Sequence, residues 1–270
     1  PLYSSAASDV YKRQESARIH AEWEKYREIL GQLAIKFINI PGSKLENCIE
    51  EALGIAGRLS NSDRGFAMRF DQKNELAYTD YAWLDEGLIS FKEKLSILPL
   101  GLLEPVWEVL KTDKILEFTD IEQIPDSNPL KNILHLLKIK TLVLMPIMEG
   151  DEFYGIVGFG KVKIQQGYSE SELFPIQMTS EIISNTLLRQ KTQNLLIESE
   201  QENQKLFNNS PVGLIYQDES GTILKANPAA LSLLGLTLGE IDGWKVLNSD
   251  WKAFSEDGAV SYTHLRAHET

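Results

Sequence analysis

The chain has 270 residues, a formal net charge of −12 at pH 7, four histidines and one cysteine. This acidic balance argues against nucleic acid or an anionic membrane surface as a partner, and one cysteine excludes an internal disulfide. The few histidines cannot build a tetrahedral metal site without carboxylates, and no apolar run reaches the roughly 20 residues that span a bilayer. We therefore expect a cytoplasmic protein with one full domain and part of another.

The two ends differ in origin from the rest of the chain. Back-translation makes the DNA for residues 9–14 an inverted repeat of the DNA for residues 259–265. The amino-acid sequences of both ends resemble the translated adapters of a sequencing library. We therefore expect residues 1–14 and 259–270 to be adapter-derived and to take no part in the fold, and the natural sequence to run over residues 15–258.

Helical spacing begins the natural sequence. Apolar residues recur at three- and four-residue intervals from Tyr26 to Phe37, so the pattern predicts a helix over residues 15–40. Ser43 and Glu46 have the spacing of a capping box for a second helix. The apolar stripe of that helix holds Cys48, for which a buried and unreactive thiol is favoured over a reactive one.

The spacing of the apolar residues then changes to the two-residue period of strands. Residues 66–70 and 76–78 alternate on either side of a polar turn and predict a hairpin. A long irregular stretch follows from residue 84. Within it we expect a short helix over residues 103–111, a strand over residues 115–118 and a further helix that begins at Pro129.

A second hairpin and a long helix complete this part of the chain. Residues 141–148 and 153–163 are apolar and rich in strand-forming side chains, and the turn at residues 149–152 joins them. Residues 169–207 then read as one long helical stretch.

The strand pattern restarts near the end of the natural sequence. Apolar residues alternate over residues 212–216, residues 218–221 are typical of a turn, and residues 222–225 are expected to form the returning strand of a hairpin. Asn227 then leads into another helix.

The order of elements over residues 26–188 resembles a GAF domain. The best local matches are the runs at residues 140–147 (KTLVLMPI) and 154–160 (YGIVGFG), together with the closing helix at residues 168–185. The family often has an aspartate where this chain has Gly160. The resemblance implies an α/β (α+β) fold, in which helices flank a central antiparallel sheet, and it says little about the ligand.

The following residues resemble the first half of a PAS domain. The matching runs are residues 206–213 and 218–230, and residues 251–258 resemble an extended strand of that family. The second half, which supplies three strands and much of the ligand pocket, is absent. The expected organisation is a GAF domain with a leading helix, a signalling helix and a truncated PAS half-domain: residues 15–190, 191–206 and 207–258.

Motifs for common chemistries are missing from the sequence. It has no phosphate-binding loop and no nucleophile elbow. Gly155, Gly158 and Gly160 lie in a strand pattern, where close strand packing or a bulge is favoured over phosphate binding. The GAF part lacks the cyclic-nucleotide signature and the cysteine beside a histidine that carries bilins, and the PAS part lacks the flavin motif. The cofactor is thus unknown, a haem-ligating histidine stays open, and the fragment is expected to catalyse nothing.

Aromatic and polar residues near the irregular crossover form the candidate small-molecule site. They are Tyr78, Asp80, Tyr81, Trp83 and Trp107. Packing of the core and its lid is the favoured alternative for these residues. For His135, a core or edge histidine is favoured over a ligand.

The long helix carries a candidate dimer seam at heptad spacing: Ile183, Leu187, Gln190, Asn194 and Ile197. The seam begins with apolar residues and continues with polar ones. Polar residues weaken a coiled coil, so a small input of energy could change the register or rotation of its helices. A homodimer with a signalling helix is the favoured interpretation, and a solvated linker is the alternative.

The leading functional hypothesis is a sensory input module of a two-component or related signalling protein. A stimulus would pass through a dimeric helix to an output domain, with a histidine kinase favoured and a diguanylate cyclase as the alternative. A GAF domain kept only as a ligand-independent dimerisation scaffold is the rival. A methionine sulfoxide reductase of GAF shape would need several reactive cysteines, which this sequence lacks.

Overall fold

The structure is a computed structural model that describes residues 26–38, 40, 42–88, 96–220, 222–237 and 239. The two expected adapter-derived ends, the start of the leading helix and the extended strand expected at residues 251–258 lie outside the described residues. The chain divides into two compact units, residues 1–191 and 192–270, and each is described by itself.

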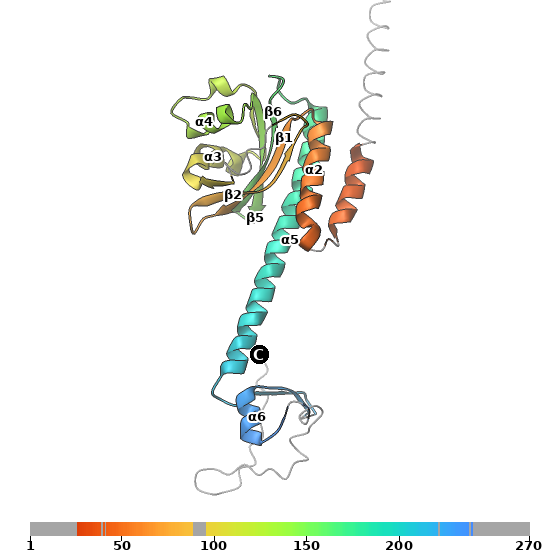
Figure 1. The fold of residues 1–270 in the computed structure, drawn as a ribbon, viewed down its shortest axis with the longest axis vertical. Coiled ribbons are helices and arrows are strands. Elements are labelled where there is room, and N and C mark those ends of the chain that lie inside the picture. The colour runs from red at the N-terminus through yellow and green to blue at the C-terminus, as the bar shows by residue number, and fades with distance from the viewer. Residues whose placement is uncertain are drawn as a thin grey trace, which may run out of the picture. The chain divides into compact units, whose positions relative to one another are not determined.

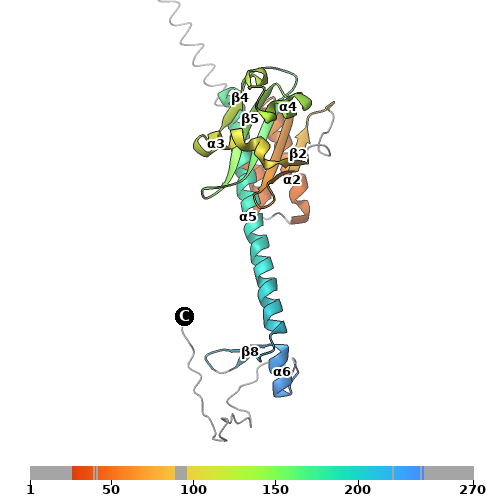
Figure 2. The same ribbon diagram turned by 90° about the vertical axis from the view of Figure 1, so that its left-hand side faces the viewer.

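A six-stranded antiparallel sheet forms the centre of the first unit, with the order β3-β2-β1-β6-β5-β4 (Figures 1 and 2). Its strands are β1 (Arg64–Asp71), β2 (Leu76–Leu84), β3 (Ile97–Pro99), β4 (Leu116–Phe118), β5 (Thr141–Glu149) and β6 (Glu152–Lys161). The hairpins predicted from the sequence, β1–β2 and β5–β6, are confirmed. They join through β1 and β6, where Ala67 pairs with Val157.

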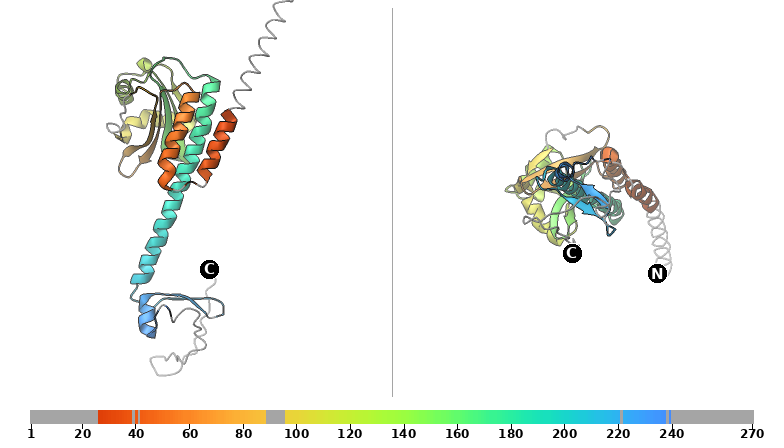
Figure 3. Two further views of the ribbon diagram at one scale, coloured as in Figure 1. Left: turned by 45° about the vertical axis from the view of Figure 1, so that its right-hand side comes forward. Right: turned by 90° about the horizontal axis from the view of Figure 1, so that it is seen from below.

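Helices cover both faces of this sheet (Figures 1 and 3). On one face lie α2 (Leu45–Leu59), the first part of α5 (Glu170–Asn209) and the helix that includes residues 26–38. On the other face lie α3 (Glu104–Thr112) and α4 (Pro129–Leu136) with short 3-10 helices at Leu100–Leu103 and Ile121–Gln123. The expected α/β fold, with helices around an antiparallel sheet, is therefore confirmed.

The alternation of side chains along the strands builds two apolar layers. On β5, Val143 and Met145 belong to the layer under α2 and α5, whereas Leu142 and Leu144 belong to the layer under α3 and α4. Both strands of this hairpin are almost wholly buried, because helices cover them from both sides.

The beginnings of two helices show how local sequence sets the fold. Asn128 caps α4, since its side chain accepts a hydrogen bond from the N–H of Leu130 at 3.0 Å. The capping box predicted at Ser43 is wrong. Ser43 lies inside a 3-10 helix, Gly42–Lys44, which precedes α2, so Lys44 occupies the N-cap position and makes no side-chain cap.

The second unit contains a hairpin and a short helix, as the sequence predicts: β7 (Ile215–Gln217), β8 (Ile223–Ala226) and α6 (Pro228–Leu234). Its organising residue is Asn227, which is fully buried. The Asn227 side chain accepts hydrogen bonds from the N–H groups of Leu214 and Ala230, and it donates to the carbonyl of Val212 at 2.8 Å. One amide thereby fixes both the approach to the hairpin and the start of α6.

Among the described residues, none of the helices combines the length and the apolar character that crossing a bilayer requires.

Candidate functional site

A small cavity of about 100 Å³ lies between the sheet and α4, on the face opposite α2. Its walls are mostly apolar and come from five strands, β1, β2, β3, β5 and β6, and from α4. The lining includes Phe66, Met68, Ile133, Leu134, Leu142 and Leu144. Such a volume is close to the roughly 150 Å³ cavity that admits benzene and below the roughly 300–1,000 Å³ of pockets for larger ligands.

The glycines of β6 set the shape of this cavity wall. A Cβ on Gly158 would lie 2.3 Å from the Phe66 ring, and a Cβ on Gly155 would lie 2.1 Å from the Met68 carbonyl oxygen. Both positions therefore need glycine so that β1 can pack closely beside β6. Close strand packing is therefore confirmed for Gly155 and Gly158, whereas a Cβ on Gly160 would meet only side-chain atoms of Ile139, at 3.3 Å.

Among the described residues that line the cavity, Arg64 is the one with a charged side chain. It occupies the first position of β1 and alternates with Phe66 and Met68, so all three face the same side of the sheet. Arg64 is only 6% exposed. Burial lowers the pKa of its guanidinium, and the neighbouring Asp63 opposes that shift in pKa.

Asp63 ties the cavity wall to the far end of β6. Its carboxylate accepts hydrogen bonds from the backbone N–H groups of Val162 at 2.7 Å and Lys163 at 2.9 Å. Its own N–H donates to the carbonyl of Gly160 at 2.9 Å. The residue before Arg64 is thus bonded directly to the segment that leads toward α5.

The structure does not gather the five predicted ligand residues into one pocket. The register of β2 against β1 shifts opposite Asp80, since Met68 pairs with Thr79 and Ala67 with Tyr81. Asp80 is the extra residue of this bulge, which changes the face that each following side chain occupies.

Two of the predicted residues meet at Arg69 on the surface of the sheet. Asp80 forms a 2.9 Å ion pair with Arg69 Nε, and the Tyr78 ring lies 4.8 Å from the guanidinium carbon. Tyr81 packs on the side of α2, where burial, followed by the charge of Asp80, raises its pKa to about 12.

The two tryptophans lie apart. Trp83 borders the cavity and packs closely on Gly54 and Gly57 of α2. Trp107 lies on α3 in the opposite layer, with its ring 5.8 Å from that of Phe70 and 5.7 Å from that of Phe153. Only Trp83 among the five touches the cavity, and the others serve packing or surface ion pairing. His135 is exposed on α4, 3.7 Å from a carboxylate oxygen of Glu122.

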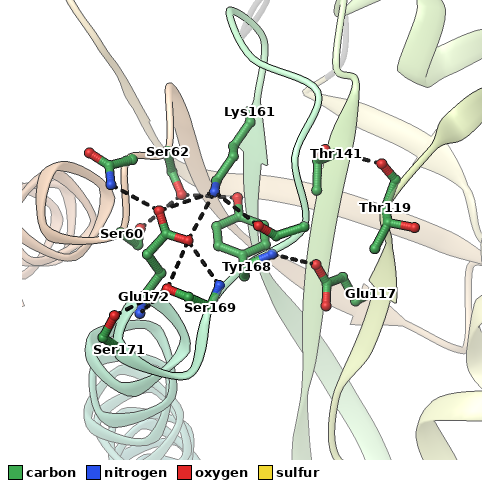
Figure 4. A network of polar contacts seen from close by, with 12 residues as sticks. Ser60, Ser62, Glu117, Thr119, Thr141, Lys161, Tyr168, Ser169, Ser171 and Glu172 are labelled. Atoms are coloured by element: carbon green, nitrogen blue, oxygen red, sulfur yellow. Dashed lines mark hydrogen bonds and ion pairs between the residues drawn. The ribbon is translucent and has the colours of Figure 1, made fainter. Parts of the chain in front are cut away.

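A buried polar network connects the sheet with the first turn of α5 (Figure 4). Lys161 Nζ at the end of β6 lies 3.1 Å from Glu172 Oε2, and the two side chains are 4% and 14% exposed. The Tyr168 ring lies 4.2 Å from the same ammonium group. These contacts hold the loop between β6 and α5 against the end of the sheet.

The network extends to the end of α2. Asn61 donates to Glu172 at 2.8 Å, and the Tyr168 and Ser62 hydroxyls lie 3.0 Å apart. Burial raises the pKa of Glu172, but hydrogen bonds from Asn61, Ser169 and Lys161 outweigh it and leave the pKa below the ordinary value. Burial raises the pKa of Tyr168, so this hydroxyl stays protonated.

The predicted dimer seam falls into two parts of different character. Ile183 and Leu187 are 0% and 8% exposed and belong to the core of their own domain. Gln190 is half-buried, Asn194 is exposed and Ile197 is 43% exposed. Ile183 and Leu187 therefore pack within their own domain, and the exposed members of the predicted seam, Asn194 and Ile197, lie in the later part of the helix.

Sequence reasoning missed Arg64, the side chains of α4 and the network at Lys161. The sequence did contain a signal for Arg64, because this charged residue has the same two-residue spacing as Phe66 and Met68 and therefore shares their face of the strand. The partnership of Lys161 with Glu172 has no comparable signal, since it arises from the path of the loop between β6 and α5.

Comparison with known proteins identifies the family. A model of the GAF domain matches residues 44–187, and a model of the PAS domain matches residues 202–263. The chain belongs to the GAF domain family, as its sequence predicts, and carries a PAS region after it. These are sensory domains, so the matches fit a sensory input module.

Solved structures share the fold at low sequence identity. The phycocyanobilin-bound GAF domain of a cyanobacterial phytochrome is 17% identical, with a TM-score of 0.52 over 62% of this chain and 96% of that one. The phycoerythrobilin-bound GAF domain of a cyanobacterial phytochrome is 18% identical, with a TM-score of 0.50 over 63% of this chain and 97% of that one. Among curated proteins there is no significant match.

Proposed function

We propose that this chain is the sensory input region of a signalling protein, in which a small molecule in the GAF cavity alters the start of α5. The observation that carries this proposal is the continuity of α5. One helix of 40 residues begins at the polar network of the GAF domain and runs on into the second unit. A change in the contacts of Glu172, in the first turn, would therefore act on a helix that continues without a break beyond the GAF domain.

The input would be a small molecule between the sheet and α4. The cavity wall is apolar except for a few groups such as Arg64 and Thr79, which is the usual composition of a ligand site. Its volume of about 100 Å³ limits the ligand to a compact molecule.

A covalently held bilin is not part of this proposal, although the two similar phytochrome domains contain bilins. The single cysteine, Cys48, lies on α2 and packs into the layer on the opposite face of the sheet from the cavity. A chromophore in the cavity would have no thiol within reach.

The coupling would run along the end of the sheet. Asp63, beside the cavity-lining Arg64, bonds the backbone of Val162, and the adjacent Lys161 pairs with Glu172 in α5. A ligand that moves the start of β1 would shift these bonds and so bias the first turn of α5.

The second part of α5 would form the dimer contact. Ile197 is an exposed apolar residue of the predicted seam. Covering its side chain in a partner would contribute roughly 1.5–3 kcal/mol if it were fully buried. We expect Ile197→Asp to shift sedimentation toward monomer, with Leu195→Asp, on the opposite side of the helix, as the matched control that adds the same charge. A chain that is monomeric at all practical concentrations would contradict the dimer.

The output would be a histidine kinase, with a diguanylate cyclase as the alternative, in a cytoplasmic protein. The GAF and PAS matches support an input role and are compatible with either output.

Native mass spectrometry of the purified chain tests the sensor against the scaffold. If the chain is a sensor, the wild-type protein and the Leu136→Trp variant should both retain a small molecule, because residue 136 is exposed on α4. The Ile133→Trp variant should lose that molecule, because its indole fills the cavity. All three proteins would otherwise show only the mass of the polypeptide, and a thermal-shift screen of metabolites would find no stabilising compound. These two results together would favour the ligand-independent scaffold.

A further inference from the structure

The polar side chains that line the GAF cavity have contacts within the protein. Among the described residues of the lining, the side chains with polar atoms are those of Arg64, Thr79 and Trp83. Arg64 and Thr79 each take part in an interaction with another group of the chain. The indole nitrogen of Trp83 lies on the side of α2, 2.9 Å from the place that a Cβ on Gly54 would occupy. None of these three side chains therefore calls for a polar ligand.

The rest of the lining is hydrocarbon. Leucine and isoleucine side chains from α4, β5 and β6 face the cavity, together with Phe66 and Met68 of β1. A hydroxyl or a charged group that leaves water for such walls gains no hydrogen bond in exchange, and this loss weakens its binding. An apolar molecule gains from the same transfer, because its surface leaves water. The walls therefore select an uncharged ligand without strong hydrogen-bonding groups.

The residues of β1 and the volume of the cavity define the shape of the ligand. Phe66 offers the edge or face of its ring, and Met68 offers a thioether, and both kinds of group make favourable contacts with an aromatic ring. The volume of about 100 Å³ lies below the roughly 150 Å³ of an apolar cavity that binds benzene. The cavity therefore has room for one small ring and no room for two fused rings.

We propose that the GAF cavity binds an uncharged, monocyclic aromatic molecule through apolar contacts, with its ring against Phe66 and Met68. This inference rests on the proposed sensory function and specifies the chemical class of its ligand. Such a ligand would also contact Ile133 and Leu134, so its binding would act on α4 as well as on the sheet.

Three probes with one ring each test the class of ligand on the whole chain. Toluene, phenol and benzoate present a methyl group, a hydroxyl and a carboxylate on the same ring, and calorimetry and thermal shift measure their binding. We expect toluene to bind about tenfold or more tightly than phenol, because the hydroxyl would lose its hydrogen bonds to water. Benzoate is expected to show no binding, because its charge would lose still more hydration.

Substitutions at one position of the wall test the place of binding. Ile133→Trp fills the cavity and should abolish the binding of toluene, whereas Leu136→Trp, at an exposed position of the same helix, should leave it unchanged. Ile133→Ala enlarges the cavity. Naphthalene should therefore raise the melting temperature of Ile133→Ala and have no effect on the wild-type chain.

Each contrary result would overturn a part of the proposal. Phenol or benzoate that binds as tightly as toluene would overturn the uncharged, apolar class, and naphthalene that binds the wild-type chain as tightly as toluene would overturn the single ring. Toluene that does not bind, or that binds Ile133→Trp as it binds the wild type, would overturn the cavity as its site. If Ile133→Trp does not fold, the comparison of the wild type with Ile133→Ala still decides the place of binding.

These results are distinct from a failure of the sensory role. Toluene that binds in the cavity and leaves hydrogen exchange of residues 168–173 unchanged would uphold the class of ligand and contradict the sensory coupling. A metabolite retained in the native mass spectrum of a chain that does not bind toluene would uphold the sensory role and overturn the class of ligand.

Discussion

The buried ion pair at the start of α5 gives the sharpest stability prediction. Glu172→Gln keeps the size of the side chain but removes its charge, and it leaves Lys161 at 4% exposure without its carboxylate. Breaking a buried pair from one side costs about 3–5 kcal/mol. We expect the lower end, about 3 kcal/mol, because Glu172 is 14% exposed and the Tyr168 ring remains 4.2 Å from the ammonium group.

Urea and thermal denaturation of the whole chain measure this cost. A loss of about 3 kcal/mol corresponds to a fall in Tm of roughly 6–12 °C for a domain of this size. Glu51→Gln is the matched control, because its 2.9 Å pair with Lys36 is well exposed and its loss should leave Tm nearly unchanged.

A double variant separates the charge from the packing. Lys161→Met with Glu172→Leu removes both charges together and should recover most of the stability that Glu172→Gln loses. A loss below about 1 kcal/mol for Glu172→Gln, or an equal loss in the Glu51→Gln control, would refute the reasoning.

Three further predictions concern the same fold. Thr179→Val should raise the free energy of unfolding by about 1–3 kcal/mol, because the Thr179 hydroxyl is fully buried and has no hydrogen-bond partner among the described residues; a lower free energy of unfolding in urea denaturation would contradict this. The folded-state pKa of Glu172 is lowered, so its stabilisation is present above the ordinary carboxylate pKa and is lost as the pH falls through the folded value. The difference in stability between wild type and Glu172→Gln should therefore shrink below about pH 4, and a constant difference would count against it. Hydrogen exchange should protect residues 141–159 strongly and residues 214–234 weakly, because the short β7–β8 hairpin leaves most of its apolar side chains exposed; equal protection would contradict the half-domain.

Much of the fold follows from local patterns. The alternation in residues 66–70 and the turn at residues 149–152 are strong hairpin signals, and both hairpins form. The pairing of β1 with β6 joins segments about 90 residues apart, which periodicity alone does not specify. The resemblance to a GAF domain implied a central antiparallel sheet, and the pairing of these two strands within it came only from the structure.

The candidate sites were harder to predict for two physical reasons. The bulge at Asp80 moves the side chains after it to the other face of β2, and no residue type announces such a bulge in advance. The stripe of Ile183 and Leu187 has the spacing of a dimer seam, but the same spacing serves a helix that packs on its own sheet. Only the structure distinguishes these two uses.

The central claim is that the state of the cavity reaches α5 through the pair of Lys161 and Glu172. Hydrogen exchange of residues 168–173 tests it most directly when Ile133→Trp, which fills the cavity, is compared with Leu136→Trp, which does not. We predict that Ile133→Trp changes protection of this segment, and that the change disappears when both charges of the pair are also removed. A change confined to α4 and the adjacent strands, with residues 168–173 exchanging as in Leu136→Trp, would contradict the account.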